Sequence, residues 1–243
     1  MTLGSKIGVL IDEFNFTNSF FAATTERAVG ELDSTAFGAG AIAAEPGLSS
    51  DKLTLRGYYN GNQAGSIYKK LRERLGAGSG NSLLGILIDT DDVNCVAECN
   101  VNGWAKSLKV NLAAPELIAF DFNMFDAISM VRGLVLWRGS VNATVPKQTV
   151  DFELAGANGG QVFVFVHDIT GTAVNAAIAI ETAANFSFTS PILKTTVLFS
   201  GIGGYVVPMT GTTSRFLRAN FTNLGGATAI NVSVIAAVKG VTF

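Results

Sequence analysis

The sequence predicts a mainly β protein, in which a β-barrel or sandwich domain with one flanking α-helix is followed by a second β-sandwich domain. Three observations support this fold class. Short runs with apolar residues at alternating positions recur along the 243-residue chain, and this alternation is typical of strands with one buried face. Turn-forming glycines and asparagines separate the runs. Only one segment has its apolar residues at helical spacing.

The first half of the chain holds a series of strand-like runs. Residues 52–56 alternate cleanly and place Leu53 and Leu55 on one face of a strand. The expected strands of this half lie at residues 7–11, 52–56, 83–89, 104–112, 116–125 and 130–137. One segment interrupts them. Residues 63–75 lack proline and are followed by Gly76, so they predict an amphipathic helix beside a sheet.

The second half predicts strands throughout. Val162, Val164 and Val166 alternate with Phe163 and Phe165 in the first of its runs. The expected strands lie at residues 161–167, 173–180, 193–199, 205–208, 216–221 and 230–238. Short strands at this spacing are typical of a sandwich.

A change in charge divides the two halves. The first 139 residues hold 12 of the 17 Lys and Arg residues and 15 of the 19 Asp and Glu residues. Because Pro146 follows this change and suits a linker, we expect one domain at residues 1–140 and a second at residues 146–243, displayed outside the first.

An apolar segment at residues 33–51 is long for a hairpin connection and has no clear period. Hydrophobic residues make up 48% of the chain and charged residues only 15%, which favours buried contacts between subunits. We therefore expect Phe37, Ile42 and Leu48 of this segment to contact a neighbouring subunit.

Candidate chemical sites are weak. The acidic residues Asp89, Asp91, Asp92 and Glu98 form one cluster, but the glycine of a calcium-binding loop is missing, so a solvated acidic turn is favoured. His167 is the only histidine and is expected to be structural. We predict no catalytic residue, no cofactor-binding residue and no metal site.

The two cysteines do not change this expectation. Cys95 and Cys99 lack a second pair of zinc ligands. If both lie on one strand, they are about 13 Å apart, too far for a disulfide. Free thiols are therefore expected.

Charge and hydropathy exclude two further classes. The net charge of −2 argues against a general nucleic-acid-binding surface. No stretch approaches the roughly 18 apolar residues of a membrane helix, and the first residues lack the basic and apolar regions of a secretion signal. We expect no membrane partner.

One run resembles a known family. Residues 31–38 (Glu-Leu-Asp-Ser-Thr-Ala-Phe-Gly) lead through a loop to residues 45–59, which contain Pro-Gly-Leu and end in Gly-Tyr-Tyr. This order is similar to that of the tail tube proteins of long-tailed, siphovirus-type bacteriophages. Residues 214–218 (Ser-Arg-Phe-Leu-Arg) look like a strand of the sandwich that follows the tube domain in such proteins, with Phe216 in place of the usual tyrosine.

The resemblance implies a structural virion protein without a cofactor. Such chains polymerise into stacked rings that form the tail tube, the conduit for DNA delivery, and contact other tail proteins. Six copies per ring are expected, because only one half of the chain has tube-like features. Double-stranded DNA would pass transiently along acidic lumen residues, for which the cluster at 89–98 is the candidate. The protein would assemble in the host cytoplasm and would be located in the tail of the virion.

Two other classes stay open. A capsid decoration or other minor virion protein would form trimers bound to a shell instead of tubes. A carbohydrate-binding sandwich would expose aromatic side chains on one face, but the second half has no Trp and a single Tyr, Tyr205. A hydrolase lacks any supporting group of residues.

Overall fold

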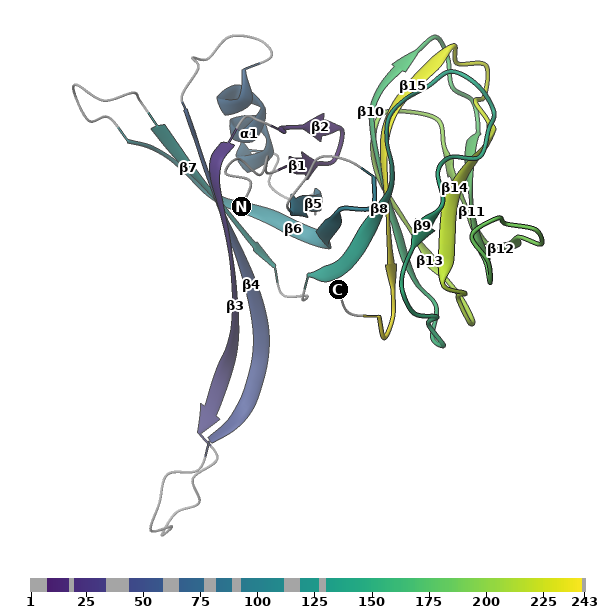
Figure 1. Ribbon diagram of the computed structural model, residues 1–243. Helices are drawn as coiled ribbons and strands as arrows, with labels where there is room; N and C mark the ends of the chain where they lie inside the picture. Colours follow the sequence, from purple (N-terminus) through teal and green to yellow (C-terminus); the bar gives the residue numbers. More distant parts are fainter. Residues whose placement is uncertain are drawn as a thin grey trace, which may run out of the picture. The chain divides into compact units, whose positions relative to one another are not determined.

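A computed structural model describes most of the chain. The described residues are 8–17, 20–33, 44–58, 66–76, 82–88, 93–111, 119–126 and 130–241. Strands dominate them, and the only helix among them is α1 (Figure 1). The predicted mainly β fold class is therefore confirmed.

The chain divides into two compact units that differ from the expected domains. The first, here called the sandwich unit, contains residues 1–18, 82–101 and 131–243. The second, here called the hairpin unit, contains residues 19–81 and 102–130. The boundary between the two units therefore does not lie at residues 140–146, because strands from the first half of the sequence belong to the sandwich unit.

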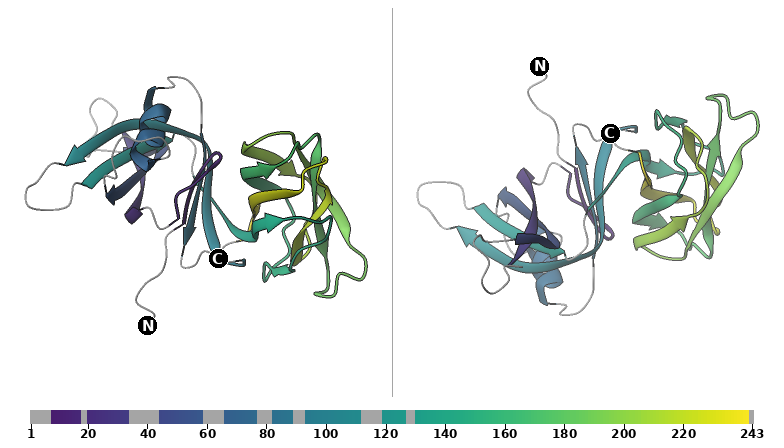
Figure 2. Two further views of the ribbon diagram at one scale, coloured as in Figure 1. Left: turned by 90° about the horizontal axis from the view of Figure 1, so that it is seen from above. Right: turned by 90° about the horizontal axis from the view of Figure 1, so that it is seen from below.

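The sandwich unit consists of two antiparallel sheets. The long sheet has the order β13-β10-β15-β8-β6-β5-β1-β2, and the small sheet has the order β12-β11-β14-β9. The strands of the long sheet are β1 (Gly8–Ile11), β2 (Phe14–Asn15), β5 (Ser82–Ile88), β6 (Val96–Asn111), β8 (Val131–Val141), β10 (Gly160–Thr170), β13 (Gly203–Met209) and β15 (Ala229–Val238). Those of the small sheet are β9 (Val150–Asp151), β11 (Ala176–Ala183), β12 (Ile192–Phe199) and β14 (Phe216–Asn223). Figure 2 shows the strands from β8 to β15, coloured green to yellow, from above and below.

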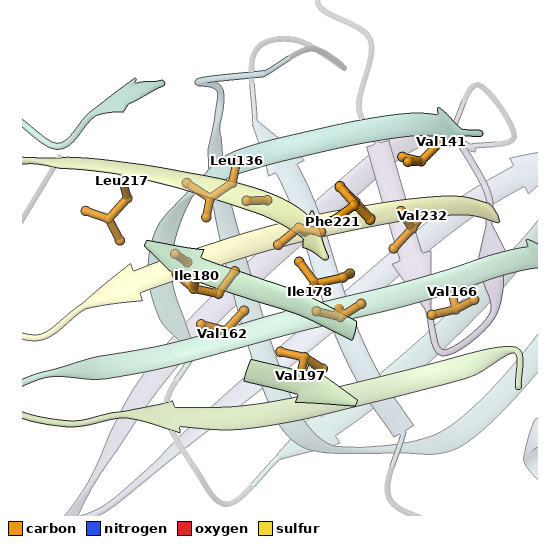
Figure 3. Close-up of a cluster of buried hydrophobic side chains, with 14 of the residues drawn as sticks. Leu136, Val141, Val162, Val166, Ile178, Ile180, Val197, Leu217, Phe221 and Val232 are labelled. Carbon is orange, nitrogen blue, oxygen red and sulfur yellow. The ribbon is translucent and has the colours of Figure 1, made fainter. Parts of the chain in front are cut away.

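The main core lies between the two sheets. Val162 and Val166 of β10 face Ile178 and Ile180 of β11, with Phe221 of β14 beside them (Figure 3). Each of these side chains is at most 1% exposed. Full burial of such a side chain stabilises a fold by about 1.5–3 kcal/mol, so the alternating apolar residues explain why these strands form two facing layers.

The other face of the long sheet is also buried. Phe163 and Phe165 of β10 belong to a second cluster that includes Leu10 of β1 and Leu87 of β5. The strand β10 is therefore covered on both faces, which accounts for its unbroken Val-Phe-Val-Phe-Val run. These contacts hold the N-terminal strands in the sandwich unit.

The hairpin unit contains an antiparallel sheet and the helix. Its strands pair in the order β3-β4-β7-β6. The elements are β3 (Phe20–Asp33), β4 (Ala44–Tyr58), α1 (Ile67–Gly76), β7 (Ala119–Asp126) and the part of β6 beyond residue 101. The purple and blue ribbons of β3 and β4 form a long hairpin in Figure 1.

The sequence made two predictions about this unit, a helix and a long loop. The predicted helix at 63–75 forms from Ile67, with Ser66 before it accepting a hydrogen bond at its Oγ from the Lys69 amide at 3.2 Å. This contact is an N-cap. The expected loop at 33–51 is wrong in part, because residues 44–51 belong to β4 and pair with β3.

Candidate functional site

The sheet of the hairpin unit has two unlike faces. Leu53 and Leu55 of β4 are buried on one face, whereas Arg56 is exposed on the other. Arg56 Nε lies 2.8 Å from Asp121 Oδ1 on the neighbouring strand β7. This contact raises the pKa of the Arg56 guanidinium. Exposed pairs of this kind add little stability.

The strand β3 has an unpaired edge. Within the described part of the chain it pairs with β4 and with no other strand, over a length of 14 residues. The N–H and C=O groups along the other edge of such a strand can pair with a strand from another chain. Native proteins usually shorten or cover strands of this kind.

Two exposed aromatic rings lie at the start of this hairpin. Phe21 of β3 and Tyr58 of β4 have ring centroids 4.7 Å apart. The side chains are 47% and 52% exposed. Aromatic side chains are enriched in protein interfaces, so this pair adds apolar contact area next to the edge of β3.

The predicted contact residues mostly lie outside the described residues. This holds for Phe37 and Ile42 and for the side chain of Leu48, whose backbone belongs to β4. Their role as a contact between rings stays a prediction.

The acidic cluster is only partly described. Residues 89–92 with Asp89, Asp91 and Asp92 lie outside the described residues. Glu98 lies on β6, where its Oε1 is 3.3 Å from Arg132 Nη2 of β8. Among the described residues no group of three or more metal-binding side chains occurs. The proposed place of the acidic residues in a lumen is not tested by this geometry.

His167 joins the β1–β2 turn to the long sheet. Its Nδ1 lies 3.0 Å from the carbonyl oxygen of Glu13, so this nitrogen must donate a hydrogen. Its Nε2 lies 2.9 Å from Ser233 Oγ and accepts from that hydroxyl. Burial lowers the pKa of His167. His167 is therefore structural, as predicted, and its ring is neutral. The sequence did not indicate either of its hydrogen-bonding partners, Glu13 and Ser233.

The cysteine prediction is confirmed. Cys95 and Cys99 are free and buried. Burial, with a smaller effect of Glu98, raises the pKa of the Cys99 thiol. A thiol in this state is a poor nucleophile and metal ligand. Both cysteines belong to the second buried cluster, which also contains Leu10 and Phe163.

Comparisons with known proteins return structural similarity alone. No family model matches the sequence, and no curated protein matches it. The virion of a gene transfer agent particle contains a chain that is 13% identical, with a TM-score of 0.39, and the match covers 54% of this chain and 97% of that one. A chain of the sheath-tube complex of the extracellular contractile injection system PVC is 14% identical, with a TM-score of 0.42 and coverage of 56% and 93%.

A third match spans nearly the whole chain. The Dit protein of SPP1, from the hub adsorption apparatus of Gram-positive-infecting phages, is 9% identical, with a TM-score of 0.32 and coverage of 95% and 98%. The chain is similar to tail and tube proteins.

Within the described residues, no helix is long and apolar enough to cross a membrane.

Proposed function

We propose that this chain is a structural tail protein that polymerises into stacked rings and forms a tail tube for DNA delivery. The observation that carries the proposal is the edge of β3 that pairs with no strand among the described residues. A ring closes when each subunit offers one sheet edge to its neighbour, because strands that continue from subunit to subunit leave no free edge. The residues that resemble tail tube proteins, 31–38 and 45–59, lie in and around the same hairpin.

The ring contact is proposed to form along β3. A strand of the neighbouring subunit would pair with its free edge, and Phe21 and Tyr58 would become buried beside the new pair. Each large apolar side chain that is fully buried contributes about 1.5–3 kcal/mol. The contact is heterologous, so it closes into a ring when the rotation between subunits is a whole fraction of a turn. Six subunits per ring follow from the family resemblance.

The stacking contact is proposed to involve Phe37 and Ile42. Rings that stack along one axis need two different, complementary faces. The link between β3 and β4 contains both residues and is apolar. Acidic residues of the lumen, for which residues 89–92 are the candidates, would repel DNA and let it pass without binding.

Charged substitutions beside the β3 edge test the ring contact. We expect Phe21→Glu with Tyr58→Glu to leave a folded subunit, because both side chains are about half exposed, and to abolish rings, because two carboxylates would be buried at the contact. A matched control is Ile202→Glu, at a position of the sandwich unit that is 56% exposed. Electron microscopy and sedimentation measure the result. Normal rings in the double variant would place the contact elsewhere.

A capsid decoration protein is the alternative within virion proteins. It predicts a closed trimer that binds a shell, whereas the proposed tube predicts an open stack. The sedimentation experiment distinguishes the two, because a trimer has one size at all protein concentrations and a stack grows with concentration.

A further inference from the structure

The long sheet of the sandwich unit curls on itself. Its edge strand β13 comes against β5, because a Cβ atom on Gly204 would lie 2.7 Å from the Cβ of Leu83. Phe165 of β10 also lies against β5, since a Cβ atom on Gly85 would be 2.9 Å from the end of its ring. The second buried cluster fills the space between these strands, so the curled sheet has an apolar interior.

A cavity of about 370 Å³ lies at one end of this interior. Gln161 of β10 and Ala237 of β15 both line it and are partners in the strand register. Ala237 belongs to the second buried cluster, and Gln161 is on the same face of β10 as Phe163, two residues further on. Cavities of this size, at the mouths of curled or closed sheets, are common places for small-ligand sites.

The lining combines apolar and polar side chains. The apolar ones are Val131, Met209 and Ala237, and the polar ones are Asn158, Gln161 and Lys239. All six belong to the sandwich unit. Met209 and Ala237 are at most 3% exposed, whereas Asn158 and Lys239 are exposed. The cavity therefore has a buried apolar side and a polar rim.

The turn before β10 fixes two residues of this rim. Gly159 has a φ of +68°, and a Cβ atom at this position would overlap the Met209 carbonyl oxygen, so the turn requires glycine here. The Gly159 carbonyl oxygen accepts a hydrogen bond from the Lys239 amide at 2.8 Å. The backbones at Asn158 and Lys239 are therefore held beside each other.

The charge of the rim favours an anion. Lys239 is the one charged residue in the part of the lining that the structure describes, and no Asp or Glu occurs there. It forms no ion pair with any described residue. The side-chain amides of Asn158 and Gln161 supply further N–H donors. One cation balances one negative charge, so a carboxylate suits this rim better than a doubly charged phosphate.

We propose that this cavity binds a small organic carboxylate with an apolar body. The carboxylate accepts hydrogen bonds from the Lys239 ammonium and from the amides of Asn158 and Gln161. Charge-assisted bonds of this kind are roughly twice as strong as neutral ones. The apolar body packs against the buried side of the cavity. The proposal does not depend on the proposed tube, because every residue that it uses belongs to the sandwich unit.

Binding of matched small molecules to the full-length chain tests the proposal. Hexanoate and benzoate are the carboxylate probes. Hexanamide and benzamide have the same bodies without the charge, hexylamine has the opposite charge, and inorganic phosphate is an anion without a body. Calorimetry or ligand-observed NMR measures the affinities. We expect at least one carboxylate to bind about tenfold more tightly than its amide, because only the carboxylate makes charge-assisted bonds.

Two variants separate the charge from the shape of the rim. Lys239→Met keeps the length of the side chain and removes its charge, so the carboxylate should bind about tenfold more weakly and the amide as before. Asn158→Asp changes one group and adds a negative charge, which should also weaken carboxylate binding. The control is Lys109→Met, which removes the charge of an exposed lysine of β6 in the hairpin unit and should not change the affinity.

Each outcome decides for or against the proposal. Preferential binding of a carboxylate that weakens in Lys239→Met and Asn158→Asp, but not in Lys109→Met, supports it. The proposal is overturned if neither carboxylate binds, if the amides, hexylamine or phosphate bind equally well, or if all variants bind alike. Circular dichroism checks that each variant is folded. Ring formation, measured on the same samples, reports separately on the proposed function.

Discussion

His167 Nε2 and Ser233 Oγ lie 2.9 Å apart inside the sandwich unit, and the other ring nitrogen of the histidine holds the backbone of the β1–β2 turn. Burial lowers the pKa of His167, so the ring is neutral at neutral pH, with Nδ1 as the donor and Nε2 accepting from the Ser233 hydroxyl. The N-terminal hairpin is therefore attached to β10 and β15 through a group that can titrate.

The first prediction concerns pH. Burial lowers the pKa of folded His167 below its ordinary value of 6.5. The unfolded chain thus binds a proton at a higher pH than the folded chain does. The free energy of unfolding should fall as the pH decreases below about 6.5 and stop falling once the folded histidine is itself protonated.

Urea titrations from neutral to mildly acidic pH measure this effect. His167→Gln keeps a polar side chain but does not titrate, so this part of the pH dependence should disappear. If the variant and the unchanged chain lose stability in parallel over this range, His167 is not the group responsible.

A second prediction concerns the close approach of β8 and β15. A Cβ atom on Gly133 would lie 2.3 Å from the carbonyl oxygen of Ala236. We expect Gly133→Ala to lower the free energy of unfolding by about 1–3 kcal/mol, as overpacking does. Gly201→Ala is the control, since its Cβ would have its nearest neighbour, the Tyr205 hydroxyl, at 4.0 Å. Equal stability of the two variants in urea would contradict this account of the strand contact.

A third prediction concerns the division of the chain. The expected domain boundary at residues 140–146 suggests that residues 146–243 are dispensable. In the structure, β8 pairs with β15, and Leu10 lies in one cluster with Phe163 and Phe165. Deletion of residues 146–243 should therefore leave a chain that does not unfold cooperatively, because the apolar residues of β1, β5 and β8 lose their cover. A cooperative urea transition of the truncated chain would restore the expected boundary.

A fourth prediction concerns stacking. Phe37→Asp with Ile42→Asp should leave rings intact and abolish long tubes, because charged groups would have to be buried between rings. Far-UV circular dichroism should be unchanged. Electron microscopy distinguishes single rings from tubes, and tubes of normal length in the double variant would show that the stacking contact lies elsewhere.

The local patterns predicted much of the fold, including the helix near 63–75 and the alternation of Leu53 and Leu55. They missed residues 44–51 of β4, because Pro46 and Gly47 are unusual inside a strand. The pairing of β8 with β15 joins residues far apart in the sequence, and nothing in either strand alone names its partner. The sequence did indicate that both faces of β10 are buried, because Phe163 and Phe165 alternate with valines and so place apolar residues on both faces.

The side-chain contacts of the candidate surfaces could not be predicted from the sequence for the same reason, because their partners lie far apart along the chain. The motif at 214–218 was recognised as a strand, but the partner of Arg218 is Glu181, which is 37 residues away. The partners of His167 are still more distant, at 154 and 66 residues. Side-chain groups that assemble across strands depend on register, which single-sequence patterns do not provide.

Negative-stain imaging of the purified chain over a range of protein concentrations tests the central claim most directly. Polymerisation through the β3 edge predicts rings that stack into tubes as the concentration rises, with or without an initiating tail complex. A strictly monomeric protein at high concentration that is also absent from purified tails would contradict it.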